Sequence, residues 1–232
     1  MCYTHFHSNK VFRGDHIQIL EQINFSDEDT LYILGDIVDR GEQPMEILLD
    51  MMNRPNVYPI MGNHDQIAIY LLPKVNKALV ENGGKLTENL KQLLLVWMSD
   101  GGKPTISGFR KLEEKQRRDV IDYLNEFNLL ETVDVGDKSF VLVHAGFGNY
   151  RPGKKFSEYT DNDLLSCRPD PSEQYFEDEN IFTVMGHTPT PYFSGKPEIY
   201  KKGRNIFIDC GACNPDGRLA CLCLDNFEEF YV

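Results

Sequence analysis

The chain has 232 residues, 41% of them hydrophobic and 26% charged, which is an ordinary globular composition. Its formal net charge of −12 argues against a general binder of nucleic acid or anionic membranes, because both partners require clustered lysine and arginine. No apolar run approaches the ~20 residues that cross a bilayer, and residues 1–10 lack a signal-peptide core, so we expect a cytoplasmic protein with reduced thiols. The sequence contains no recognisable linker, and we predict one domain over residues 1–232.

The amino-terminal region is predicted to form a short strand, a helix and a polar turn. Residues 2–7 are a candidate strand, and the apolar residues within 17–23 have the spacing of a buried helix face. Residues 24–29 form the polar turn that leads into the next strand. A second helix is predicted from the Pro44 region to about Asn53, with proline near its first turn.

A buried strand is predicted at Leu31–Leu34, because this apolar run is bounded by the turn residue Gly35. Asp36, Asp39 and Arg40 follow at its carboxyl end, where open α/β sheets place their ligands. Two carboxylates and a guanidinium buried together need a cation or an anionic ligand to balance their charge. For this segment alone, the alternative is an exposed acidic turn with a surface ion pair.

Three later stretches repeat this design. Each is a short apolar run, and they span residues 57–61, 139–143 and 181–185. They end at Asn63-His64, His144 and His187. A lone histidine is usually a core or surface residue, but four strand ends with the same pattern are hard to obtain by chance. Carboxylate, amide and imidazole ligands suit Mn²⁺, Fe²⁺ or Zn²⁺, and two such ions about 3.5–4 Å apart can activate a bridging water. Asp36 is the natural bridging carboxylate.

A helical insert is predicted over about residues 73–128. A helix that ends near Leu72 precedes it, and helices at 86–98 and 113–127 lie within it. The Gly101–Pro104 break divides these two helices. The insert carries no chemical motif, so we interpret it as a cap or wall beside the sheet, with Trp97 in the core.

The carboxyl-terminal region, residues 205–232, is predicted to form antiparallel strands joined by the Asn214–Gly217 turn. Four cysteines also gather here, at positions 210, 213, 221 and 223. A zinc site is one interpretation. The alternation of Cys221 and Cys223 within an apolar run favours the other interpretation, in which they are small core residues.

Together these strand ends resemble the signature blocks of the PPP-type metallophosphatases, which include Ser/Thr protein phosphatases, bacteriophage lambda phosphatase and symmetrical diadenosine tetraphosphatases. The matching blocks, in the family's order, are Gly35–Gly41, Gly62–Asp65, His144–Gly146 and Gly186–Pro189. Each block is weak alone, whereas the combination is specific. The resemblance implies an α/β protein with a calcineurin-like β-sandwich flanked by helices. It also implies a dinuclear site for divalent metal ions, with Mn²⁺ the first expectation and Fe²⁺ or Zn²⁺ the alternatives.

The resemblance assigns metal ligands position by position. Asp36 corresponds to the bridging carboxylate, and Asn63, His144 and His187 correspond to the remaining ligands of the second metal. These four residues form the part of the site that the sequence supports most strongly.

The resemblance also assigns residues to the reaction itself. His64 corresponds to the general acid for the leaving oxygen, and Asp39 corresponds to the carboxylate that orients it. Arg40 and Arg168 correspond to the two arginines that hold the phosphate. Arg168 lies in a Cys-Arg-Pro setting, and its alternative reading is a solvated loop charge.

The family's first block, Asp-x-His-Gly, is missing from this sequence. An ungapped alignment puts Ser8 and Lys10 at the ligand positions, and a short insertion puts His5 and His7 there instead. Asp15–His16 is a third possibility. His7 is therefore a candidate ligand of the first metal. We expect the second metal to bind well and the first to bind poorly.

The leading functional prediction is hydrolysis of phosphoserine and phosphothreonine monoesters by metal-bound hydroxide. Hydrolysis of dinucleoside polyphosphates is the alternative, because small bacterial members of the family divide between these substrates. A third reading is a catalytically impaired member that binds phosphate, which the missing first block favours. Met61 replaces the arginine that eukaryotic protein phosphatases carry before the Gly-Asn-His block, so one phosphate contact is lost. The expected partner is a phosphorylated protein or a small phosphoester, and the sequence does not indicate an oligomeric state.

Overall fold

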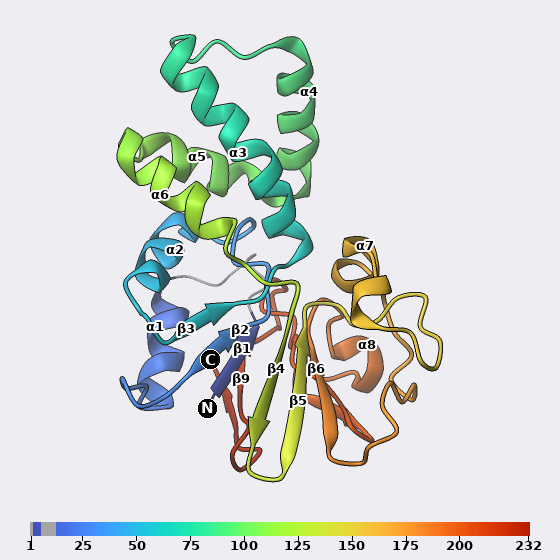
Figure 1. Cartoon of the computed structure of the whole chain (residues 1–232). Helices are drawn as coiled ribbons and strands as arrows, with labels where there is room; N and C mark the ends of the chain where they lie inside the picture. Colours follow the sequence, from blue (N-terminus) through green and yellow to red (C-terminus); the bar gives the residue numbers. More distant parts are fainter. Residues whose placement is uncertain (1, 6–12) are drawn as a thin grey trace.

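The computed structural model describes residues 2–5 and 13–232. The chain forms two five-stranded mixed sheets, with helices on their outer sides (Figure 1). The first sheet has the strand order β10-β9-β1-β2-β3. Its strands are β1 (Cys2–His5), β2 (Leu31–Ile33), β3 (Val57–Pro59), β9 (Ala220–Cys223) and β10 (Glu229–Tyr231). Within it β1, β2 and β3 run parallel, whereas β9 pairs antiparallel with both β1 and β10.

The second sheet has the order β4-β5-β6-β8-β7. Its strands are β4 (Leu130–Val135), β5 (Lys138–Val143), β6 (Ile181–Met185), β7 (Tyr200–Lys202) and β8 (Asn205–Phe207). Here β5, β6 and β8 are parallel, and the edge strands β4 and β7 pair antiparallel with their neighbours. The parallel strands of each sheet thus carry their carboxyl ends to one end of that sheet.

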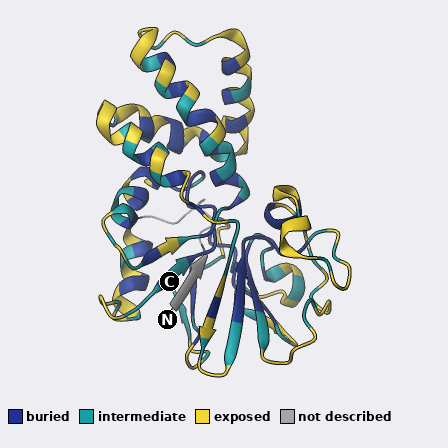
Figure 2. Cartoon of the chain, viewed as in Figure 1, coloured by how far each residue is buried: buried dark blue, intermediate teal, exposed yellow. Residues whose placement is uncertain are grey.

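The two sheets share a buried core between them. Strand β9 contributes Leu222, and the facing strands contribute Phe140, Leu142, Val184 and Ile206. All five side chains are at most 2% exposed, so this layer is dry and close-packed. Figure 2 shows the same burial along the central strands, while the outer faces of the helices are exposed. This packing fixes the relative position of the strand ends that follow.

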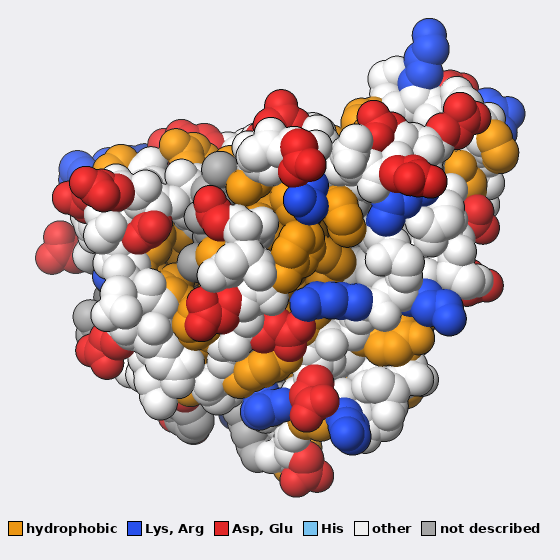
Figure 3. Space-filling model, turned by 90° about the horizontal axis from the view of Figure 1, so that it is seen from below, with side chains coloured by type: hydrophobic (Ala, Val, Ile, Leu, Met, Phe, Trp, Pro, Cys, Tyr) orange, Lys and Arg blue, Asp and Glu red, His pale blue; other side chains and the backbone are white. Residues whose placement is uncertain are grey.

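Helices flank both sheets, and those within residues 63–124 extend beyond one end of the sheets (Figure 1). Those between β1 and β4 are α1 (Arg13–Gln22), α2 (Pro44–Met52), α3 (Asn63–Glu81), α4 (Glu88–Trp97), α5 (Lys103–Lys111) and α6 (Glu114–Leu124), with a π turn at Met98–Gly102 between α4 and α5. Beside the second sheet lie α7 (Asp161–Leu165), α8 (Pro191–Ser194) and a 3₁₀ turn at Phe156–Glu158. Within the described residues, no helix has both the length and the apolar composition needed to span a bilayer. On the face seen from below in Figure 3, acidic and basic side chains are interspersed among hydrophobic ones.

The interval predicted as a helical insert contains α4 to α6, but two of its details are wrong. The helix expected to end near Leu72 continues to Glu81, with Pro73 inside it. A proline removes one backbone hydrogen bond, and the rest of this long helix compensates for the loss. The predicted break is confirmed at Gly101, whose φ of 106° interrupts the helix, but α5, which begins at Lys103 with Pro104 in its first turn, was not predicted.

The predicted pairing of the carboxyl-terminal strands is also wrong. The Asn214–Gly217 turn lies between β8 and β9, which belong to different sheets. Strand β8 instead joins the second sheet parallel to β6, and β9 pairs with β1 and β10. The alternation of polar and apolar residues within 205–232 indicates strands, but it does not indicate which distant strands they pair with.

The long loop after β5 is anchored by Asp163 at the start of α7. Its carboxylate accepts hydrogen bonds from Asn149 Nδ2 at 2.6 Å and from the Thr160 N–H at 3.0 Å. Lys154 Nζ lies 3.5 Å from the same carboxylate. The backbone bond from Thr160, followed by the side-chain bonds and the lysine charge, lowers the pKa of Asp163 to about 2.

We expect the substitution Asp163→Asn to lower the free energy of unfolding by about 1–2 kcal/mol at neutral pH. Because the pKa of Asp163 is depressed in the folded chain, its stabilisation is complete above the usual pKa of 3.8 and is lost as the pH falls toward about 2. Urea unfolding at several pH values should therefore show the difference from wild type shrinking below about pH 4. Asp27→Asn, at an exposed position, is the control. A difference that stays constant with pH contradicts the assignment.

Candidate functional site

The structure brings three of the predicted metal ligands together. Asp36 follows β2, His144 follows β5 and His187 follows β6, and one ligand atom from each lies within 4.8 Å of the others. His144 Nδ1 lies 2.7 Å from the Leu34 carbonyl oxygen, which can only accept, so Nδ1 carries the proton. His144 Nε2 then presents its lone pair to the cluster.

Asn63, at the first position of α3, completes this cluster. Its Oδ1 lies 3.1 Å from His144 Nε2, and Asp36 Oδ2 lies 3.6 Å from the same nitrogen. Three acceptor atoms therefore converge, an arrangement that a cation satisfies. A carboxylate, an amide oxygen and two imidazoles also match the ligand preferences of divalent transition metals. The residues present thus fit the metal site that the sequence predicts.

The backbone around these ligands adopts an uncommon conformation. Asp36, Asp39, Arg40 and His187 have φ values of 54°, 73°, 57° and 60°, in the left-handed region that non-glycine residues rarely occupy. Each such residue costs about 1–3 kcal/mol and persists only where the surroundings enforce it. Backbone strain is thus concentrated at the strand ends that carry the predicted site residues.

Asp65 holds the strained segment after β2 in place. Its carboxylate accepts hydrogen bonds from the N–H groups of Asp36 at 2.7 Å, Ile37 at 3.1 Å and Val38 at 3.3 Å, and from Gly62 N–H at 2.9 Å. Burial and the charge of Asp36 raise the pKa of Asp65 to about 7, while the N–H donors act in the opposite direction. A β-carbon at Gly62 would lie only 2.4 Å from Asp36 Oδ1, so glycine is required there.

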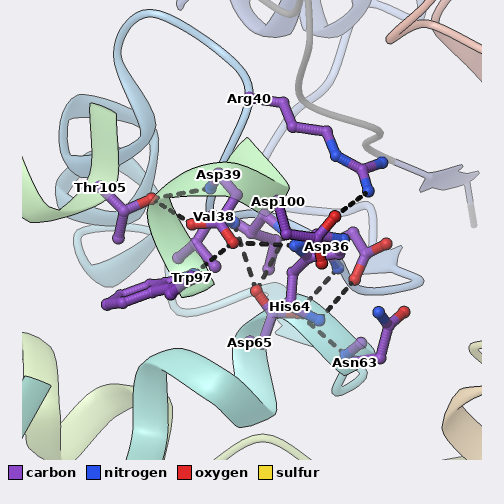
Figure 4. A network of polar contacts seen from close by, with 12 residues as sticks. Asp36, Val38, Asp39, Arg40, Asn63, His64, Asp65, Trp97, Asp100 and Thr105 are labelled. Carbon is purple, nitrogen blue, oxygen red and sulfur yellow. Dashed lines mark hydrogen bonds and ion pairs between the residues drawn. The ribbon is translucent and has the colours of Figure 1, made fainter. Parts of the chain in front are cut away.

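His64 and Asp39 form a buried pair next to the cluster (Figure 4). His64 Nδ1 lies 2.8 Å from Asp39 Oδ2. Burial lowers the pKa of His64, but the hydrogen bond to Asp39 and the charge of Asp36 outweigh it, so the pKa lies above its ordinary value. The pairing favours the protonated imidazole, which is the form that can donate a proton.

Two residues of the helical insert position Asp39. Trp97 Nε1 donates to Asp39 Oδ2 at 2.6 Å, and Thr105 Oγ1 donates to Asp39 Oδ1 at 2.6 Å. The Asp39 N–H in turn donates to Thr105 Oγ1 at 2.8 Å. Trp97 is buried at 2% exposure, as predicted for a core residue, but it also contacts the site. The insert is therefore a structural part of the site.

Arg40 points from the same segment toward the insert. Its Nη2 lies 3.4 Å from Asp100 Oδ1, and its N–H donates to the Gly101 carbonyl at 2.9 Å. Gly101 has φ 106°, and a β-carbon there would come within 2.4 Å of Arg40 Cγ. The side chain of Arg40 is 21% exposed, so its guanidinium can contact a bound anion.

The remaining predicted residues have different outcomes. Arg168 is exposed, and its guanidinium carbon lies 6.0 Å from the ring of Tyr192, which is near His187 in the chain. His7, Ser8 and Lys10 lie outside the described residues. Strand β1 ends at His5 and runs parallel to β2, so its carboxyl end lies at the same end of the sheet as that of β2.

The Asp15–His16 alternative for the first block lies elsewhere. His16 is buried in α1, and its Nε2 lies 3.1 Å from Asp50 Oδ2 on α2. Among the described residues, the one group of three or more His, Cys, Asp and Glu side chains arranged to hold a metal is the Asp36 cluster. Cys210, Cys213, Cys221 and Cys223 are among the described residues and do not belong to that group. Burial raises the pKa of Cys210 to about 12, so its thiol stays protonated at neutral pH.

Sequence reasoning missed the supporting residues of the site. Asp65 stood inside a recognised block without an assigned role. Trp97 was assigned only to the core, although a buried indole N–H usually finds an acceptor, and that rule could have prompted a search for one. Thr105 and Asp100 gave no signal, because their partners lie 66 and 60 residues away.

A two-sheet sandwich that holds a carboxylate, an amide and two imidazoles beside a histidine–aspartate pair is the architecture of a metallophosphoesterase. A model of the calcineurin-like phosphoesterase family matches residues 7–213. The chain therefore belongs to the calcineurin-like phosphoesterase family, a family of phosphoester hydrolases that use divalent metals.

Relatives support the same assignment. The chain is 24% identical over 217 residues to the symmetrical bis(5'-nucleosyl)-tetraphosphatase of Proteus mirabilis (strain HI4320), covering 91% of this chain and 68% of the relative. A solved structure with a provisional assignment as a diadenosine tetraphosphatase matches with TM-score 0.64 at 17% identity, covering 100% of this chain and 92% of that one. A metallophosphoesterase from Sphaerobacter thermophilus matches with TM-score 0.53 at 17% identity, covering 100% and 88%. These structural matches confirm the predicted fold class.

Proposed function

We propose that this protein hydrolyses dinucleoside polyphosphates, with cleavage of the central phosphoanhydride of a dinucleoside tetraphosphate. The observation that carries the proposed reaction is the buried His64–Asp39 pair beside the Asp36 cluster, because it places a proton donor next to a cation site. The substrate class is supported by the similarity to the Proteus mirabilis tetraphosphatase. Met61, in place of a phosphate-binding arginine, weakens the protein-phosphatase alternative.

In this proposal Arg40 binds a non-bridging phosphate oxygen, and Asp100 restrains the guanidinium. Asp39 holds the Nδ1 proton of His64, so that Nε2 is the nitrogen that donates. Water adds to one phosphorus of the central bridge and loses a proton to solvent, while the bridging oxygen leaves with the proton of His64. His64 regains a proton from solvent, and the products are two nucleoside diphosphates. Arg168 is proposed as a second phosphate-binding arginine.

Asp36, Asn63, His144 and His187 are proposed to hold a divalent ion, Mn²⁺ first, with Fe²⁺ or Zn²⁺ as alternatives. Divalent metal bound there supplies Lewis-acid activation of water and neutralises phosphate charge. Asp36 is the bridging carboxylate of this proposal, and His7 is retained as a proposed ligand of a first metal.

The test compares three substrates with purified protein and added Mn²⁺. We expect diadenosine tetraphosphate to be converted to ADP with a higher kcat/KM than release of phosphate from a phosphoserine peptide. The variant Asp36→Asn, prepared in parallel, corrects for contaminating phosphatases. Hydrolysis of the peptide without the dinucleotide supports the Ser/Thr phosphatase alternative and contradicts the proposal. Binding of a phosphopeptide, with no hydrolysis of either substrate or of an aryl phosphate, supports the impaired-member alternative.

A further inference from the structure

A groove of about 520 Å³ opens between α3 and α4, next to the candidate site. Its lining includes Gln66 and Tyr70 of α3, Val96 and Trp97 at the end of α4, and Asp100 in the π turn that follows. Trp97 also donates to the Asp39 carboxylate, so the wall of the groove and the His64–Asp39 pair share a side chain. The groove therefore borders the candidate site through Trp97 and through Asp100, which pairs with Arg40.

The lining of the groove has the chemistry of a nucleobase site. The ring of Tyr70 is 58% exposed and Val96 is 68% exposed, which is unusual for large apolar side chains that face a concave surface. Lys74 Nζ lies 3.4 Å from the centroid of the Tyr70 ring and so restrains its position. An exposed, restrained aromatic ring offers a stacking surface for a base.

The polar groups of the groove are ordered along the path from phosphate to base. Arg40 is the proposed phosphate ligand, and Asp100, 3.4 Å from it, is a half-exposed carboxylate in the lining of the groove. Carboxylates are the usual partners of ribose hydroxyls in nucleotide sites. Tyr70 lies seven residues after Asn63, on the same face of α3 and about 10.5 Å along its axis at 1.5 Å per residue. That spacing leaves room for a ribose between the cleaved phosphate and the ring.

We propose that this groove binds the nucleoside of the leaving nucleotide, with the base stacked on Tyr70 and the ribose hydroxyls donating to Asp100. This inference rests on the proposed function, because it assigns one half of the dinucleotide to a place beside His64. Phosphate contacts alone do not distinguish a nucleotide from any other phosphoester. The groove would therefore supply the selectivity for a nucleotide substrate.

The groove can be tested by direct binding, because Trp97 is the single tryptophan of the chain and lines the groove. ADP and inorganic pyrophosphate are titrated into the Mn²⁺-loaded protein, and tryptophan fluorescence is recorded. We expect ADP to bind at least about tenfold more tightly than pyrophosphate. Tyr70→Ala should reduce this preference by about tenfold, in line with the loss of one base–aromatic stack. In hydrolysis, KM for diadenosine tetraphosphate should rise with little change in kcat.

Two matched controls separate the groove from general effects on the fold. Tyr58→Ala removes another exposed tyrosine, on β3, and Leu95→Ala removes an exposed neighbour of Val96 that does not line the groove. Both should retain the preference for ADP, and melting temperatures show that all variants fold. Equal affinity of ADP and pyrophosphate in the wild type overturns the inference, as does an equal effect of Tyr70→Ala and Tyr58→Ala. Preferred binding of ADP without hydrolysis of the dinucleotide supports the groove while contradicting the proposed function.

Discussion

With a phosphoserine peptide as the test substrate, the variant His64→Asn is expected to lower kcat by about 10²–10⁴-fold, the range that a general acid contributes. His64 is 3% exposed and is fixed by Asp39 at 2.8 Å, so no solvent group can take over its position. Asparagine can keep a hydrogen bond to Asp39 but cannot donate a titratable proton. Because the Asp36 cluster is left intact, metal content should stay at the wild-type level. Steady-state kinetics combined with metal analysis measures both quantities.

The size of this loss should depend on the leaving group. A phosphoserine peptide releases an alkoxide that needs a proton, whereas an aryl phosphate releases a stabilised phenolate. The defect of His64→Asn should therefore be larger for the peptide than for the aryl ester. Trp97→Phe, which removes only one hydrogen bond to Asp39, should show a smaller defect of the same kind. His16→Asn, at a buried histidine bonded to Asp50, is the control. An equal loss for both esters would show that His64 is not the acid.

The variant Asp36→Asn is expected to lose bound metal and, with it, almost all hydrolysis. Asp36 is 1% exposed and provides the charged oxygen of the cluster, which balances a cation where His144 and His187 are neutral ligands. Substitution of a residue that hydrogen-bonds to a metal ligand weakens metal affinity by about 10–100-fold. Loss of a direct ligand should weaken metal affinity by more than this. The folded structure should persist, because asparagine preserves the shape of the side chain.

Metal content after dialysis, and anomalous scattering from Mn²⁺-loaded crystals, would measure this effect. For the wild type we expect one tightly held ion, since the sequence lacks the Asp-x-His-Gly block of the first metal. Asp137→Asn makes the same chemical change on the β4–β5 turn, where the side chain is 83% exposed, and should have no effect. Two tightly held ions in the wild type, or unchanged metal content in Asp36→Asn, would contradict these expectations.

The parts of the site that sequence could predict are those in which a strand end carries its own ligand. Asp36, His144 and His187 each follow an apolar run, and parallel strands bring such ends together. That argument needs only the strand pattern and the rule that ligands gather at carboxyl ends. The two-sheet sandwich was predicted from the family resemblance and not from the strand pattern.

The parts that sequence missed depend on contacts between distant segments. Trp97 and Thr105 reach Asp39 only because the insert folds back onto the strand end, and no local pattern reports that geometry. The left-handed φ of Asp39, which aspartate adopts more readily than most residues, is likewise held by contacts with distant segments. We predicted a helix end at Pro73 because the sequence shows the cost of a proline inside a helix. The sequence does not show the stability of the complete helix, which continues to Glu81.

The attachment of Asp39 to the insert has a consequence for how the protein loses activity on heating. Segments such as α4 and α5 can open as a unit before the rest of a protein unfolds. Such opening would take Trp97 and Thr105 away from Asp39 while the sandwich and its metal ligands remained folded. Thermal inactivation would then precede the main melting transition, because the α4–α5 segment would open at a lower temperature than the sandwich.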